Sequence, residues 1–139
     1  MEELRLPGTL DSLPVVSAYV NEAAAEAGLD EQAAYGLRLA VDEIATNAIV
    51  HGYQEAGRSG DLLLRATLAA DKLTIVLEDT SPPYDPRQTP PPDDLEQAPE
   101  ERPSGGFGVY LAMQGADAFR YEYVDGGTNR LMFMMNRTV

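Results

Sequence analysis

The sequence predicts an α/β fold, a two-layer α/β sandwich in which a mostly antiparallel, mixed sheet carries helices on one face. Two segments with helical spacing of apolar residues come early in the chain, and four extended segments after them form two hairpins. Helices and hairpins mixed in this order are typical of a sheet covered on one side. A chain of 139 residues supports one core. We therefore expect a single domain over residues 1–139.

The helices are expected in the first part of the chain, after a short strand. Residues 2–6, "EELRL", alternate in polarity as a strand does. A first helix is expected to begin near Asp11 and to stop at Gly28, because glycine is a common C-terminal helix stop. Residues 29–53 predict a second and longer helix, for which Asp30 is a candidate N-cap.

The strands are expected as two hairpins. "DLLLRATLAA" and "KLTIVLED" are extended segments joined around Asp71, and "AFRYEYV" and "NRLMFMMN" are joined by the turn "DGGT". Between the hairpins, residues 81–103 contain eight of the ten prolines and six acidic residues. Because proline removes backbone donors, this segment is predicted to be a long loop, either functional or a solvated acidic linker. "SGGFGVYLAMQGA" then predicts a glycine-rich turn that enters a short helix.

Composition excludes several classes of function. The net charge of −13 makes direct binding to nucleic acid or to an anionic membrane improbable, and it favours a basic protein partner. The chain has no cysteine and one histidine, which excludes thiolate and multi-histidine metal sites. There is no GxxxxGK[ST] motif, no apolar run of transmembrane length and no secretory signal at the N-terminus. A soluble cytoplasmic protein is therefore expected.

The second helix carries polar side chains beside its apolar face. Glu43 and Asn47 lie one turn apart on a neighbouring ridge, and His51 continues this ridge nearer the core. A carboxylate and an amide arranged in this way could bind a hydrated Mg²⁺ or orient a hydroxyl group. The alternative is an ordinary boundary ridge that faces water.

Two further groups of residues suit a nucleotide. Asp79 ends an apolar strand, where its carboxylate could accept a hydrogen bond from an exocyclic amine or could simply cap a turn. Gly105, Gly106 and Gly108 precede a helix, where backbone N–H groups could approach an anion. A tight turn between a loop and a helix also needs glycine.

The order of these groups resembles a known family. "DEIATNAIVHGY" resembles the N box, "EDTSPPYDP" the first glycine box and "GGFGVYLA" the second glycine box of the GHKL, or histidine-kinase-like, ATPase superfamily. That superfamily shares a Bergerat-type ATP-binding fold and includes gyrase, the heat-shock chaperone of ninety kilodaltons, sensor histidine kinases and mismatch-repair ATPases. The segments "SPPYDP", "EERPSGGFGVYL" and "GGTNRLMF" are most similar to those of anti-sigma factor serine/threonine kinases.

The resemblance implies roles for individual residues in phosphate transfer. Asn47 matches the asparagine that binds Mg²⁺, and Glu43 matches the glutamate regarded as the general base. Such a base would take a proton from a seryl or threonyl hydroxyl as its oxygen attacks the γ-phosphate of ATP. His51 matches no catalytic residue, and we expect a hydrogen-bonded structural histidine.

The resemblance also implies how the nucleotide is held. Asp79 matches the aspartate that reads adenine, and Thr128 matches the sheet threonine near adenine. Ser81 stands where the family has the glycine of D-x-G, and a side chain there is expected to narrow the pocket. Gly105, Gly106 and Gly108 match the second glycine box, and residues 81–104 fall where the family has its ATP lid.

The function implied is ATP- and Mg²⁺-dependent phosphorylation of an anti-sigma antagonist, together with sequestration of a sigma factor. This would regulate transcription without contact with DNA, in agreement with the acidic charge. The family also implies a homodimer. The alternative is a regulatory module that binds ATP or a protein partner and catalyses no reaction. A regulatory fragment of a sensor kinase is not favoured, because no phosphoacceptor helix with its own histidine is available.

Overall fold

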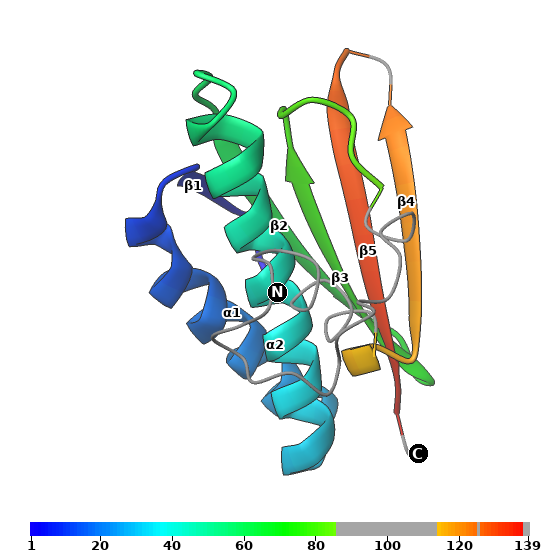
Figure 1. Cartoon of the computed structure of the whole chain (residues 1–139). Coiled ribbons are helices and arrows are strands. Elements are labelled where there is room, and N and C mark those ends of the chain that lie inside the picture. Colours follow the sequence, from blue (N-terminus) through cyan, green and yellow to red (C-terminus); the bar gives the residue numbers. More distant parts are fainter. Residues whose placement is uncertain (86–113, 125, 138–139) are drawn as a thin grey trace, which may run out of the picture.

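A computed structural model describes residues 1–85, 114–124 and 126–137 of the chain (Figure 1). The predicted loop and the glycine-rich turn, including Gly105, Gly106 and Gly108, lie largely or wholly outside the described residues. The strands are β1 Leu4–Pro7, β2 Asp61–Leu68, β3 Lys72–Asp79, β4 Ala118–Val124 and β5 Thr128–Asn136. The helices are η1 Leu10–Ser12, α1 Leu13–Ala27, α2 Glu31–Asn47 and η2 Ala48–Gln54.

The five strands form one sheet in the order β1-β2-β3-β5-β4, with α1 and α2 together on one side of it (Figure 1). Every strand pairing among the described residues is antiparallel. The predicted two-layer α/β arrangement is therefore confirmed, with a sheet that is antiparallel throughout this part of the chain. The central pairing joins β3 to β5, and it places Asp79 opposite Asn129.

The core lies between the helices and the sheet. Side chains alternate along the strands, so Leu62 and Leu64 of β2 are fully buried while Leu63 between them is only partly buried. The residues of α1 and α2 that face them are Val16, Val20, Leu37, Val41 and Ile44, each at most 2% exposed. This packing holds the C-terminal part of α2 against the ends of β3 and β5.

The ends of the helices follow the predicted signals. Gly28 adopts a left-handed conformation, φ 74°, and its N–H closes α1 by donating to the carbonyls of Ala24 and Ala25. Asp30 caps α2, because its Oδ1 accepts a hydrogen bond of 2.7 Å from the N–H of Ala33.

The second helix is not α-helical over its whole predicted length. It continues to Gln54, but the segment after Asn47 is a π-helix, η2. Such wider turns are rare and are often found at functional sites. The buried Tyr53 of η2 anchors this segment to the sheet, because its hydroxyl accepts from the N–H of Thr80 and donates to the carbonyl of Asp61, both at 2.8 Å.

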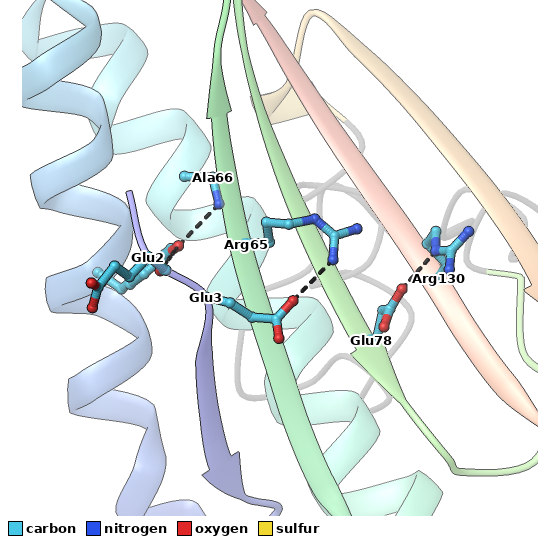
Figure 2. Close-up of polar contacts among 7 residues, drawn as sticks. Glu2, Glu3, Arg65, Ala66, Glu78 and Arg130 are labelled. Carbon is cyan, nitrogen blue, oxygen red and sulfur yellow. Dashed lines mark hydrogen bonds and ion pairs between the residues drawn. The ribbon is translucent and has the colours of Figure 1, made fainter.

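The face of the sheet opposite the helices carries ion pairs. Figure 2 shows Arg130 beside Glu78, at 2.6 Å, and Arg65 beside Glu3, at 3.2 Å. Arg130 also contacts Glu122 of β4 at 3.3 Å. Among the residues that the structure describes, no helix combines the length and the apolar character needed to cross a membrane.

Candidate functional site

A cavity of about 410 Å³ lies between the C-terminal part of the long helix and the ends of β3 and β5. It is lined from the helix by Ile44, Asn47, Ala48, His51 and Gly52, and from the sheet and the segment after β3 by Asp79, Ser81, Pro82, Pro83, Tyr84, Asn129 and Leu131. Asn47 and Asp79, which are 32 residues apart in the sequence, therefore share one cavity. A volume of this size is within the range of small-molecule sites.

Helical spacing explains which side chains of α2 and η2 reach the cavity. Asn47 and Ala48 lie three and four residues after Ile44, and His51 lies three residues after Ala48 and four after Asn47, so the four side chains share a face. Glu43 lies one turn before Asn47 and is half-buried, outside the set of residues that line the cavity. The two residues thus lie on neighbouring turns, as predicted from their spacing.

Two neighbouring acidic residues of α2, Asp42 and Glu43, have raised pKa values. Burial, and to a smaller extent the neighbouring charge of Asp42, raises the pKa of Glu43 above its ordinary value. Burial also raises the pKa of Asp42, against the opposing effects of a hydrogen bond from Ser17 and the charge of Arg38. The Ser17 hydroxyl of α1 lies 2.8 Å from both oxygens of Asp42, so Asp42 joins the two helices.

Asn47 presents an amide that the described residues do not fully satisfy. Its Nδ2 atom is buried and has no hydrogen-bond partner within this part of the structure. A buried donor without a partner is unfavourable by about 1–3 kcal/mol, which a bound ligand could offset. The residues also fit Mg²⁺, because this ion keeps several waters and phosphate oxygens and needs few protein oxygens, one of which the amide of Asn47 could supply.

Asp79 lies at the end of β3 and is only 4% exposed. Its Oδ1 accepts three hydrogen bonds: from the N–H of Ser81 at 3.0 Å, from the hydroxyl of Ser81 at 2.6 Å and from the amide of Asn129 at 2.9 Å. Within the described residues no hydrogen bond reaches Oδ2. That oxygen is left for a ligand.

Ser81 packs against Gly52 of η2. A Cβ atom added to Gly52 would lie 2.5 Å from the Cβ and 2.7 Å from the Oγ of Ser81, closer than van der Waals contact allows. The serine side chain therefore occupies space that the glycine leaves open, while its hydroxyl is turned to Asp79. The cavity retains a volume of about 410 Å³ with this serine in place.

Two predicted site residues lie outside the interior of this cavity: His51 is at its edge, and Thr128 lines a different cavity. The expectation that His51 lies nearer the core is wrong, because its side chain is 49% exposed at the edge of the cavity. Its Nδ1 lies against the Oε2 of Glu55 one turn later. Thr128 lines a second cavity, of about 370 Å³, on the other side of Asp79, so its predicted contact with adenine remains a prediction.

No role was assigned from the sequence to Gly52 and Asn129, which line the cavity, or to Tyr121, which contacts Asn129. The pairing of β3 with β5 brings Asn129 to Asp79, and Tyr121 of β4 donates a hydrogen bond of 2.5 Å to the Oδ1 of Asn129. Their only signal in the sequence is a polar residue at the start of a strand and a tyrosine within one. The two hairpins lie far apart in the chain, so the alignment of their strands was not available from local patterns.

Comparisons with known proteins identify the kind of domain. Residues 6–134 match the model of the family described as histidine kinase-like ATPase domain. The chain is 24% identical over 138 residues to "Serine-protein kinase RsbW" of Bacillus licheniformis. This alignment covers 97% of this chain and 86% of that protein. The chain is 23% identical over 137 residues to the protein of the same name from Bacillus subtilis, covering 96% and 85%. The protein of this name from Staphylococcus aureus is 25% identical over 112 residues, covering 78% and 70%.

Proposed function

Because the chain belongs to the histidine kinase-like ATPase domain family, we propose that it is an ATP- and Mg²⁺-dependent protein serine/threonine kinase that acts as an anti-sigma factor in the cytoplasm. Its protein substrate is an anti-sigma antagonist, and its second partner is a sigma factor. The relatives named as serine-protein kinases support the phosphotransfer reaction. The observation that carries the proposal is the cavity that both Asn47 and Asp79 line.

In this proposal the two ends of the cavity hold the two ends of ATP. Asp79 accepts a hydrogen bond from the exocyclic amine of adenine, in a site that is largely shielded from water. The amide oxygen of Asn47 would be a ligand of Mg²⁺. Bound Mg²⁺ supplies positive charge that offsets the negative charge of the transferred phosphoryl group. The glycines of the second glycine box are proposed to hold the phosphates through backbone N–H groups.

Glu43 is proposed as the general base. It accepts the proton of a seryl or threonyl hydroxyl as that oxygen forms a bond to the γ-phosphorus, and the bond from this phosphorus to the β–γ bridging oxygen breaks to release ADP. The raised pKa of Glu43 suits this role, since a carboxylate with a higher pKa is a stronger base near neutral pH.

The acidic charge supports protein partners over nucleic acid. At a net charge of −13, the chain would repel DNA and would attract a partner with a basic surface. We propose that the sigma factor and the antagonist bind to a homodimer of this chain.

Phosphate transfer from ATP to a candidate antagonist tests the catalytic proposal. We expect Glu43→Gln to lower the rate of transfer by about 10²–10⁴-fold, because the amide cannot accept the proton. Glu26→Gln, which changes an exposed acid on α1, serves as the control and should leave the rate unchanged. Equal rates for Glu43→Gln and the parent would remove Glu43 from its role as base.

The alternative is a module that binds ATP without catalysis. Ser81 in place of the family's glycine is the observation that favours it. Calorimetric titration with ATP and Mg²⁺ distinguishes the two. Binding by the parent that is lost in Asp79→Ala, combined with no phosphate transfer to any antagonist, would support the module and contradict the kinase.

A further inference from the structure

A chain of hydrogen bonds runs from the segment after β3 to Asp79. The N–H of Tyr84 donates to the hydroxyl of Tyr121 at 3.2 Å, and this hydroxyl donates to the Oδ1 of Asn129 at 2.5 Å. The amide Nδ2 of Asn129 donates in turn to the Oδ1 of Asp79 at 2.9 Å. The N–H of Tyr84 also reaches the Oδ1 of Asn129 at 3.4 Å, and all of these bonds are donated in the direction of Asp79.

The surroundings of Asn129 permit only one orientation of its amide. Its Nδ2 faces three other acceptors, the carbonyl of Ser81 at 2.9 Å, the carbonyl of Pro82 at 3.2 Å and the hydroxyl of Ser81 at 3.3 Å. Reversing the amide would place its oxygen against these oxygens and against the carboxylate, while its nitrogen would face the N–H of Tyr84, which now lies 3.4 Å from Oδ1. Burial raises the pKa of Tyr121, so the phenol keeps its proton and remains a donor at neutral pH.

Asp79 is held through one oxygen as a result. Asn129, at 2% exposure, and Ser81 bring three donors to Oδ1, and this fixes the plane of the carboxylate. The other oxygen keeps its acceptor capacity on a residue that lines the cavity. A carboxylate oxygen held in one direction can accept a hydrogen bond from the amine of a ligand, but it repels the oxygen of a carbonyl group at the same place.

We propose that Asn129 and Tyr121 are positioning residues that set the preference of the cavity for an aminopurine over an oxopurine, by orienting Asp79. This inference rests on the proposed function, because it takes the cavity to be the nucleotide site. Asn129 orients the carboxylate directly, and Tyr121 acts through Asn129. In this proposal neither Asn129 nor Tyr121 contacts the nucleotide.

The test compares the affinities for ATP and for inosine triphosphate, which has a carbonyl in place of the exocyclic amine. With Mg²⁺ present, we expect the parent to bind ATP at least about tenfold more tightly, as the loss of one hydrogen bond to a charged group implies. Tyr121→Phe removes the hydroxyl that donates to Asn129 and accepts from the N–H of Tyr84, and we expect it to reduce the ratio of the two affinities at least about threefold. Asn129→Leu, of similar volume, should reduce the ratio further.

The control is Tyr123→Phe, which removes a hydroxyl from a 49% exposed side chain of the same strand. We expect this variant to keep the parent's ratio. A purely structural role of Tyr121 would weaken the binding of both nucleotides equally, and an unchanged ratio in folded Tyr121→Phe would overturn the inference. Should Asn129→Leu fail to fold, Tyr121→Phe alone decides the outcome. A parent that binds neither nucleotide would instead refute the proposed function.

Discussion

At the scale of single residues, the pair Ser81 and Gly52 shows how one position compensates for another. Ser81 stands where the resemblance to the family predicts a glycine, and Gly52 lacks a side chain at the point of contact. The hydroxyl of Ser81 is also one of the three donors to Asp79. The serine therefore contributes to the polar side of the cavity while the glycine across from it supplies the space.

This contact predicts that substitutions at the two positions depend on one another. We expect Gly52→Ala to lower the free energy of unfolding by about 1–3 kcal/mol, because the new methyl group overlaps Ser81. In a Ser81→Gly background the same change should be neutral or stabilising, since alanine favours a helix over glycine by about 0.5–1 kcal/mol. Urea unfolding of the parent, both single variants and the double variant measures the coupling. Additive effects would contradict the contact.

At the scale of elements, α2 connects the core to the site. One face of the helix is buried among apolar residues, and its middle turn carries the half-buried acids Asp42 and Glu43. Asp42 accepts a hydrogen bond from Ser17 of α1. Burial and, to a smaller extent, the charge of Asp42 raise the pKa of Glu43, so the folded helix disfavours the ionised form of this residue.

A raised pKa makes stability depend on pH. Below about pH 4.3, the ordinary pKa of glutamate, both the folded and the unfolded chain carry protonated Glu43. As the pH rises above this value the unfolded chain loses its proton first, so the free energy of unfolding falls until the pH passes the raised pKa of the folded chain. The Glu43→Gln variant has no ionisable group at this position, so its free energy of unfolding does not fall for this reason as the pH rises. We therefore expect the variant to be more stable than the parent at pH 7, by a margin that shrinks toward pH 4.

Chemical denaturation of both proteins at pH 4 to 8 measures this margin. Glu26→Gln is again the matched control, because Glu26 is exposed on α1 and its substitution should leave the pH dependence unchanged. A margin for Glu43→Gln that is constant with pH, or that grows toward pH 4, would show that burial of Glu43 does not disfavour its charge.

At the scale of the whole molecule, the sheet has two unlike faces. One face is covered by α1 and α2 and forms the core (Figure 1). The other carries charged pairs that cross neighbouring strands, of which Glu78–Arg130 joins the central strands β3 and β5 (Figure 2). Since this pairing also sets Asn129 against Asp79, the outer face supports the alignment on which the inner face depends.

Two of the outer pairs, Arg130–Glu78 and Arg65–Glu3, differ in burial, which predicts a difference in their contributions to stability. The side chain of Glu78 is 13% exposed, whereas that of Glu3 is 50% exposed. We expect Arg130→Gln to lower the free energy of unfolding by about 1–3 kcal/mol, chiefly because it leaves the largely buried Glu78 without its cation, and it also removes the contact with Glu122. Arg65→Gln, the matched control, should cost less than about 1 kcal/mol. Thermal or urea unfolding checks both values, and equal losses would contradict the role given to burial.

The elements themselves were accessible from the sequence because local interactions determine them. The stop at Gly28, the cap at Asp30 and the hairpin of β2 and β3 each depend on residues close together in the chain, and the structure has them as predicted. The order of the polar motifs also indicated the family. That Asn47 and Asp79 share a cavity could be expected from that resemblance alone.

Only the tertiary structure decided what surrounds Asp79. The alignment of β3 with β5 across 50 residues of sequence makes Asn129 its neighbour, and the π-helical turn brings Gly52 against Ser81. These contacts join segments that are distant in the chain, and their geometry depends on strand alignment and side-chain packing throughout the core. Local patterns carry no information about either, because a strand pattern is satisfied equally well by several partners and several alignments.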